Sequence, residues 1–238
     1  MRNPIIAALD LPSADRAVAL ATQLAPLVGA CKIGAELFTT AGPEVVRRVR
    51  ALGAPVFLDL KFHDIPNTVA RAVEAATRLG VDMLTVHASG GRAMLEAAER
   101  AALATARTLG APPPLVLAVT VLTSLDAAAL AEVGWGTGVA QQVERLAQLS
   151  RRAGLRGLVC SPLELAGLRA LLGPDVVLVT PGIRSAAAPP DDQRRTLTAA
   201  EALAAGASWL VVGRPLYAAP DPKAAAQQLL EELPRSRG

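Results

Sequence analysis

Short apolar runs alternate with longer stretches of helical spacing along almost the whole chain. A short apolar run bounded by turn residues is typical of a buried strand, whereas apolar residues three and four positions apart are typical of a helix. The predicted strands are Ile5–Leu9, Cys31–Gly34, Val56–Leu60, Met83–His87, Leu115–Leu122, Gly157–Cys160, Val176–Val179 and Trp209–Val212. The pattern therefore predicts eight strands in alternation with about eight helices.

Turn and capping residues mark the ends of the predicted helices. Glycine follows a helix wherever the chain must turn with a positive φ, and the glycines in such places are Gly53, Gly80, Gly110, Gly154, Gly173 and Gly206. The segments Ser161–Glu164 and Thr198–Glu201 both match a capping box, in which a hydroxyl and a carboxylate cap the first turn reciprocally. These signals support the alternation of strands and helices.

The order of elements favours a (β/α)₈ barrel that forms a single domain over residues 1–238. The chain has 238 residues and is 52% hydrophobic, which suffices for one large core. An open doubly wound sheet is the competing fold, but no G-x-G-x-x-G follows the first predicted strand. Eight units of this size fit the closed barrel better.

Polar residues gather at the carboxyl ends of the predicted strands, where barrel enzymes carry their active sites. They are Asp10, Lys32, Asp59, Lys61, His87, Thr123, Ser161, Arg184 and Arg214. The loops after the last two strands, Thr180–Arg184 and Val212–Pro215, each contain a glycine and an arginine, as an anion site requires. We expect a phosphorylated substrate, although turn glycines and surface arginines would explain each loop taken singly.

The segment Asp59–Thr68 carries the strongest chemical signal. It follows an apolar strand, and the strand period places Asp59 and Lys61 on one face with Leu60 on the other. A solvated strand end with weak ion pairs is the alternative. The chain has only three lysines, Lys32, Lys61 and Lys223, and two of them end predicted strands. A compact ammonium group is therefore expected to be required there, since arginine fills every other basic position.

Composition argues against several other classes of protein. The net charge is +3, but the basic residues are dispersed and the aromatic residues are 3 Phe, 2 Trp and 1 Tyr, so we expect no nucleic-acid partner. No apolar run is long enough for a membrane helix and no cleavage-like segment begins the chain, which predicts a cytoplasmic protein without membrane contact. Cys31 and Cys160 are expected to be inert core thiols.

The two histidines, His63 and His87, are interpreted as structural. Neither has a nearby nucleophile or metal-ligand spacing in the sequence, so a general base is the less favoured reading. The sequence predicts neither a metal site nor a cofactor.

These motifs resemble the orotidine 5′-phosphate decarboxylase family over almost the whole chain. The matching segments follow the family's order and include Ala8-Leu9-Asp10, Lys32-Ile33-Gly34, Asp59–Thr68, Leu122-Thr123-Ser124, Thr180–Arg184, Asp192-Gln193 and Val212–Pro215. The resemblance implies a cofactor-independent decarboxylase that converts orotidine 5′-phosphate to UMP in a homodimer with shared active sites. Lys61 would stabilise and then protonate the carbanion at C6 of the pyrimidine.

The resemblance also implies a role for each site residue. Lys32, Asp59, Lys61 and Asp64 would form an alternating charged tetrad, with Asp64 supplied by the second subunit. The residues expected to bind substrate are Asp10, Lys32 and Thr68 at the ribose, Thr123 and Ser124 at the pyrimidine, Arg184, Gln193, Gly213 and Arg214 at the phosphate, and in addition Asp59, Asp64 and Ile65. The segment from Ser185 to Gln193 would close over the site, although its Ala186–Pro190 stretch departs from the family pattern.

Two other functions stay open at this point. One is a magnesium-dependent sugar-phosphate decarboxylase or aldolase of the same barrel superfamily, which shares the D-x-K-x-x-D pattern and stabilises an enediolate. The other is a non-catalytic barrel that binds a phosphorylated ligand. The Leu122-Thr123-Ser124 segment speaks against the first, and the two lysines and three aspartates speak against the second.

Overall fold

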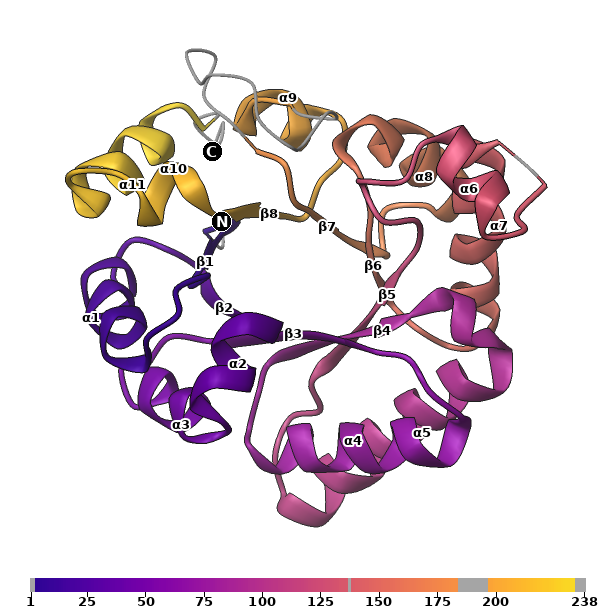
Figure 1. Cartoon of the computed structure of the whole chain (residues 1–238), viewed down its shortest axis with the longest axis horizontal. Coiled ribbons are helices and arrows are strands. Elements are labelled where there is room, and N and C mark those ends of the chain that lie inside the picture. Colours follow the sequence, from indigo (N-terminus) through magenta and orange to yellow (C-terminus); the bar gives the residue numbers. More distant parts are fainter. Residues whose placement is uncertain (1–2, 137, 184–196, 234–238) are drawn as a thin grey trace.

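Eight parallel strands form one closed barrel in chain order, and helices surround it (Figure 1). The computed structural model describes residues 3–136, 138–183 and 197–233. The strands are β1 (Ile5–Ala8), β2 (Ala30–Gly34), β3 (Val56–Phe62), β4 (Met83–His87), β5 (Leu115–Val119), β6 (Gly157–Val159), β7 (Val177–Thr180) and β8 (Trp209–Val212). The (β/α)₈ barrel expected from the sequence is confirmed.

The helices occupy the intervals between the strands. They are α1 (Ala14–Leu24), α2 (Ala35–Ala41), α3 (Glu44–Arg50), α4 (Pro66–Arg78), α5 (Gly91–Leu109), α6 (Ala127–Glu132), α7 (Val139–Arg152), α8 (Leu165–Leu172), α9 (Ala199–Ala204), α10 (Arg214–Tyr217) and α11 (Pro222–Glu231). Two 3₁₀ turns, η1 (Ala88–Gly90) and η2 (Pro162–Glu164), precede α5 and α8.

Several strand ends differ from the sequence prediction by one residue, and three larger differences concern α2 with α3, β5 and β3. The stretch after β2 is broken into α2 and α3, because Gly42 follows α2 with a φ of 64° and Pro43 is the N-cap of α3. β5 ends at Val119 instead of Leu122, and the chain then turns, with the Leu125 N–H donating to the Leu122 carbonyl at 3.0 Å. β3 runs on to Phe62, which pairs with β4.

Alternation along the strands separates two apolar clusters. Ile6, Ala30 and Phe57 belong to a small cluster inside the barrel, whereas their strand neighbours Ile5 and Leu58 pack in the larger cluster between barrel and helices. Parallel strands covered by helices are buried on both faces, so near-continuous apolar runs are expected there. Toward the carboxyl ends, the inward positions become polar, and this change of character locates the site.

The helix ends follow the sequence signals closely. All six glycines predicted to follow helices have positive φ, from 62° at Gly110 to 104° at Gly206. Ser161 and Thr198 both form the predicted capping boxes, with Glu164 and Glu201 respectively. Pro66 occupies the first turn of α4, as expected.

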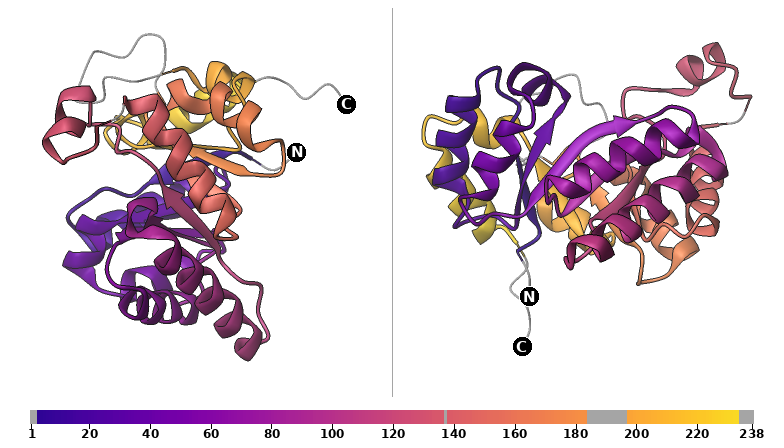
Figure 2. Two further views of the ribbon diagram at one scale, coloured as in Figure 1. Left: turned by 90° about the vertical axis from the view of Figure 1, so that its right-hand side faces the viewer. Right: turned by 90° about the horizontal axis from the view of Figure 1, so that it is seen from below.

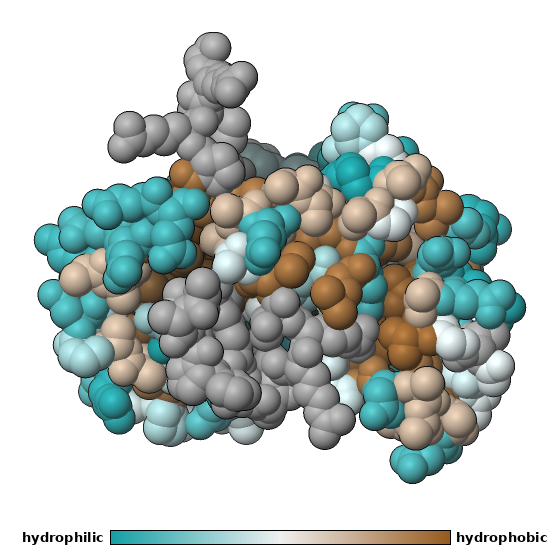
Figure 3. Space-filling model, turned by 90° about the horizontal axis from the view of Figure 1, so that it is seen from above, coloured by the Kyte–Doolittle hydropathy of each residue, from teal (hydrophilic) through white to brown (hydrophobic). Residues whose placement is uncertain are grey.

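The outer surface carries both hydrophilic and hydrophobic residues, and the two cysteines are buried as predicted. Figure 3 shows one face of the molecule. Among the described residues there, hydrophilic ones gather toward the left and right edges and hydrophobic ones lie between them. No helix within residues 3–136, 138–183 and 197–233 has the length and apolar character needed to cross a bilayer. Cys31 and Cys160 are buried free thiols, and burial raises their pKa to about 11 and about 12.

A residue beyond β7 pairs with a residue just before α9. Ile183, three residues after Thr180, forms an isolated parallel bridge with Leu197. The residues between them, 184–196, lie outside the described structure.

Arg169 joins three segments at the amino-terminal side of the barrel. From α8 its guanidinium donates to the carbonyl oxygens of Gly173 at 2.7 Å and Val176 at 2.9 Å, and to that of Gly206 at 2.7 Å. Ser208, which Arg169 also contacts, accepts from the Leu178 backbone N–H. One side chain therefore connects α8 with the entries to β7 and β8.

We predict that Arg169→Ala lowers the free energy of unfolding by about 2 to 3 kcal/mol, because hydrogen bonds from a charged group are among the stronger ones. Urea unfolding followed by circular dichroism measures the change. Arg100→Ala is the matched control, since that side chain is 70% exposed and its ion pair to Glu96 spans 3.7 Å. Equal effects of the two substitutions would contradict the role of Arg169.

Candidate active site

Four charged side chains of alternating sign form a chain at the carboxyl ends of β1, β2 and β3. Lys32 Nζ lies 2.8 Å from Asp10 Oδ1 and 3.8 Å from Asp59 Oδ2. Lys61 Nζ lies 2.9 Å from both carboxylate oxygens of Asp59. The order Asp10–Lys32–Asp59–Lys61 therefore pairs every charge with an opposite one, which is the condition for keeping charges away from water.

The middle of this chain is the most buried part. The Lys32 and Asp59 side chains are 9% and 13% exposed, whereas Asp10 and Lys61 at the ends are 40% and 36% exposed. Gly34 makes room for the first pair, since a Cβ there would lie 3.0 Å from both Asp10 Oδ1 and Lys32 Nζ. The polar ends are thus the parts that a bound molecule can reach.

The predicted facing of the β3 residues is confirmed. Asp59 and Lys61 meet on one side of the strand, and Leu60 packs against the outer apolar cluster. The backbone at Lys61 is unusual, with a φ of 51°, and no other described non-glycine residue has a positive φ. Such a conformation is costly for a residue with a Cβ, and where it occurs it often marks a functional site.

Thr85 belongs to the site, and the sequence analysis missed it. It lies on β4 with no exposed surface, and its Oγ1 accepts from the Lys61 N–H at 2.8 Å and donates to Asp59 Oδ1 at 3.0 Å. The signal was present in the strand period, because Thr85 falls on the inward face between Met83 and His87. A buried hydroxyl at an inward position needs a partner.

The two histidines face each other beside the charged chain. The ring centroids of His63 and His87 are 5.2 Å apart, with the planes tilted by 36°. Burial lowers the pKa of His87 below its usual value, and the nearby His63 and Lys61 lower that pKa further, against the opposing effect of Asp59. These effects favour the neutral form of His87.

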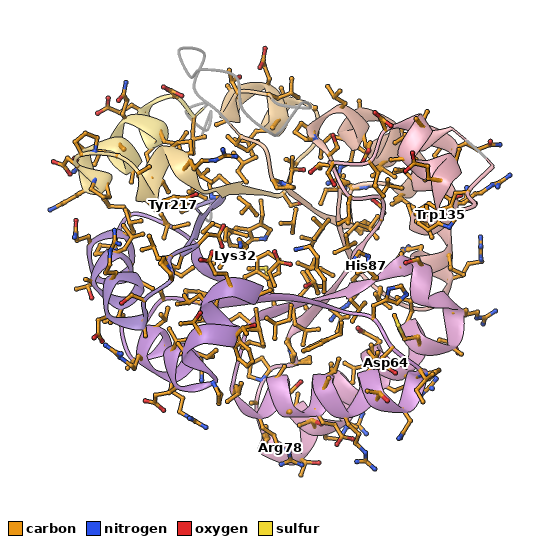
Figure 4. All side chains as sticks on the ribbon, in the orientation of Figure 1. Lys32, Asp64, Arg78, His87, Trp135 and Tyr217 are labelled. Carbon is orange, nitrogen blue, oxygen red and sulfur yellow. The ribbon has the colours of Figure 1, made fainter. Side chains whose placement is uncertain are left out.

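The residues that follow β3 lie away from this chain's own charged cluster. Asp64, Ile65 and Thr68 are all exposed, and Ile65 has 66% of its surface open to solvent. Asp64 Oδ1 accepts from the Ile65 N–H at 2.6 Å. Figure 4 shows Lys32 toward the middle of the barrel and Asp64 out over the ring of helices beside α4 and α5. The structure therefore does not bring Asp64 into the tetrad within one chain.

The remaining predicted site residues that the structure describes lie on other loops of the same barrel end. Thr123 and Ser124 form the turn after β5, and α6 beyond them stands out from the helical ring (Figure 2). Gly213 and Arg214 begin α10 directly after β8, and Arg214 is exposed. Arg184 and Gln193, together with the predicted closing segment from Ser185, lie outside the described residues.

The described part of the chain contains no group of three or more His, Cys, Asp or Glu side chains that could hold a metal ion. Both oxygens of Asp59, the most central carboxylate, contact the Lys61 ammonium. The arrangement can surround a polar ligand with fixed charges and present one ammonium proton to it.

Comparison with known proteins agrees with this geometry. A sequence model described as "Orotidine 5′-phosphate decarboxylase / HUMPS family" matches residues 3–229. Proteins named orotidine 5′-phosphate decarboxylase from Moorella thermoacetica and Paramagnetospirillum magneticum are 54% and 53% identical to the chain. Each alignment covers 98% of this chain, and 92% and 99% of the respective relative.

A solved structure shows the same likeness in three dimensions. The crystal structure of orotidine 5′-phosphate decarboxylase from Lactobacillus acidophilus superposes with a TM-score of 0.85 at 38% identity, over 98% of this chain and 100% of that one. The resemblance inferred from the sequence motifs is thereby confirmed. The chain belongs to the orotidine 5′-phosphate decarboxylase / HUMPS family.

Proposed function

We propose that this chain decarboxylates orotidine 5′-phosphate to UMP without a cofactor, and that Lys61 is the catalytic acid. One observation carries the proposal: the Lys61 ammonium ends a buried chain of alternating charges at the carboxyl end of the barrel. The family name joins two groups of proteins, so membership alone does not choose the reaction. Relatives that are more than half identical and named orotidine 5′-phosphate decarboxylase support the choice.

The reaction explains why an ammonium is needed. When the bond between C6 and the carboxylate breaks, CO₂ leaves and the electron pair stays on C6. That pair lies in the plane of the ring, where the π system cannot delocalise it. Lys61 stabilises the developing negative charge electrostatically and then transfers a proton from Nζ to C6. Asp59 pairs with the ammonium where it is partly buried, since both of its carboxylate oxygens lie 2.9 Å from Lys61 Nζ.

The rest of the substrate has matching groups around the barrel end. Asp10 and Lys32 would hold ribose hydroxyls. This is supported by Lys32 Nζ, which lies 2.8 Å from Asp10 Oδ1 and 3.8 Å from Asp59 Oδ2. Thr123 and Ser124 would contact the pyrimidine. Gly213 and Arg214, with Arg184 and Gln193, would hold the phosphate. These contacts lie away from the reacting carbon, so their binding free energy can serve to orient the substrate.

We further propose that the enzyme works as a homodimer in which Asp64 completes the partner subunit's tetrad, with Ile65 and Thr68 beside it. The exposure of this segment supports the proposal. An apolar side chain that is 66% exposed, next to a carboxylate turned away from its own cluster, fits a surface that a second subunit covers. An isologous interface would form two equivalent sites.

The magnesium-dependent sugar-phosphate rival fits the geometry less well. Its metal would need carboxylate oxygens that are free to coordinate, because magnesium prefers such ligands. In this chain both Asp59 oxygens lie 2.9 Å from Lys61 Nζ. The charged chain is accordingly better suited to electrostatic stabilisation by an ammonium.

The first test is the reaction itself, run with and without a chelator. We expect the purified protein to convert orotidine 5′-phosphate to UMP, seen as a loss of ultraviolet absorbance, and to keep its rate after exhaustive treatment with EDTA. A loss of rate that magnesium restores would instead support the enediolate rival. Binding of UMP without any turnover would support the non-catalytic alternative.

The second test removes the proposed acid. Lys61→Ala should abolish measurable turnover while it changes UMP affinity by no more than about one to two orders of magnitude, because the lost interaction acts mainly in the transition state. Steady-state kinetics and calorimetric UMP binding measure the two effects. Lys223→Ala, which removes an exposed ammonium from α11, is the matched control and should behave as wild type. Substantial turnover by Lys61→Ala would reject the assignment.

The third test asks whether the active site is shared. Lys61→Ala and Asp64→Ala subunits, each inactive alone, are unfolded, mixed and refolded. Random pairing makes about half of the dimers mixed, and each mixed dimer has one site with both residues intact. We therefore expect about a quarter of wild-type activity to return.

The control for this mixing experiment is each variant refolded alone, which should regain no activity. If Asp64 served its own subunit's Lys61, every site in the mixture would carry a lesion. Mixing would then restore nothing, and the shared site would be ruled out.

A further inference from the structure

A change of register between β3 and β4 falls next to the charged cluster. Leu58 pairs with Leu84, and the next pair joins Phe62 to Val86. The chain thus advances four residues along β3 but two along β4. In the strand register, the three residues of β3 from 59 to 61 therefore stand opposite a single residue of β4, Thr85. A bulge of this kind bends its strand and redirects side chains, and bulges are common beside active sites.

The Thr85 hydroxyl makes hydrogen bonds to β3 where the backbone pairing between β3 and β4 is interrupted. A hydroxyl has one proton to donate and lone pairs to accept with. Thr85 Oγ1 accepts from the Lys61 N–H at 2.8 Å, and it donates to Asp59 Oδ1 at 3.0 Å. One buried side chain thus fixes both the Lys61 N–H, which the bulge would leave unpaired, and a charged oxygen of Asp59.

The positive φ of Lys61 makes this anchor important. At a φ of 51° the backbone of Lys61 is in a conformation that a residue with a Cβ rarely adopts. In that conformation the side chain turns back toward Asp59, so that Nζ reaches both carboxylate oxygens at 2.9 Å. Such strain persists only where the surroundings hold it, and the hydrogen bond to Thr85 holds the Lys61 nitrogen directly.

We propose that Thr85 is the positioning residue for the catalytic pair: its hydroxyl fixes the backbone of Lys61 and the carboxylate of Asp59 at the same time. The branched Cβ of threonine limits the side chain to few rotamers, which keeps the oxygen between its two partners. This inference rests on the proposed role of Lys61 and adds a residue that does not itself touch the substrate.

Substitution of Thr85 tests the proposal. Thr85→Val keeps the shape and removes the hydroxyl, and it should lower kcat by about tenfold to a hundredfold, the range expected for a small misplacement of a reacting group. KM and the affinity for UMP should stay within about threefold of wild type, since the contacts proposed for the ribose, the pyrimidine and the phosphate do not involve Thr85. Thr85→Ser, which keeps the hydroxyl, should retain most of kcat.

Two controls separate positioning from general stability. Thr77→Val makes the same chemical change at another buried threonine, whose hydroxyl donates to the Val73 carbonyl within α4, and it should leave kcat unchanged. The number of sites that bind UMP, counted by calorimetry, corrects kcat for any unfolded fraction. A loss of kcat that persists per binding site in Thr85→Val therefore reports the reaction and not the folded population.

Amide hydrogen exchange at Lys61 tests the hydrogen bond without reference to activity. In wild type and Thr85→Ser the Lys61 amide should exchange slowly, and in Thr85→Val it should exchange faster. A Lys61 amide that exchanges in wild type as fast as in an unfolded peptide would overturn the proposal even if Thr85→Val did not fold. Wild-type kcat in Thr85→Val, or equal impairment of the Val and Ser variants, would overturn it too. A wild-type protein that turned over no orotidine 5′-phosphate would reject the proposed function instead, and the exchange result would still decide the anchor.

Discussion

The rest of the site depends on one carboxylate, that of Asp59, held between two ammonium groups in a place with little access to water. Its side chain is 13% exposed, with Lys61 Nζ at 2.9 Å and Lys32 Nζ at 3.8 Å from its carboxylate oxygens. A buried charge without a partner would cost several kcal/mol, so neither lysine nor the aspartate is dispensable to the others. Asp10 extends the alternation and leaves the cluster close to neutral. The surrounding chain has to supply space and anchors for this arrangement, which accounts for Gly34 and Thr85 at positions that have no direct role in chemistry.

The barrel can house these charges because its inward side chains change from apolar to charged along the strands that carry them. Apolar side chains such as Ala30 and Phe57 close the amino-terminal part of the interior, and the next inward positions on the same strands are Lys32 and Asp59. The charged side chains therefore lie against packed apolar side chains on the amino-terminal side, and the cluster is open to solvent only toward the carboxyl end of the barrel. Rigid strands hold them more closely than loops could, so little reorganisation is needed when charge develops in a reaction.

Much of this could be read from the sequence, for reasons that lie in local chemistry. Strand periodicity placed Asp59 and Lys61 on one face, and the capping box at Ser161 and the turn at Gly206 follow from neighbours in the chain. The contribution of Thr85 could not be predicted in the same way. It depends on the register between β3 and β4, which is set by pairing across the barrel and not by residues next to each other in sequence. The positive φ at Lys61 falls within the same interval of shifted register.

The bridge between Ile183 and Leu197 has a consequence for how such a barrel can diversify. Because the two residues are paired, the ends of the intervening stretch are fixed relative to β7 and α9 whatever its length or composition. The free energy of closing a loop between fixed ends grows only slowly with the number of residues. Insertions, deletions and an alanine- and proline-rich composition between residues 184 and 196 can therefore accumulate without disturbing the strands. Natural variation in the length of this stretch can thus leave β7, α9 and the charged cluster unaltered.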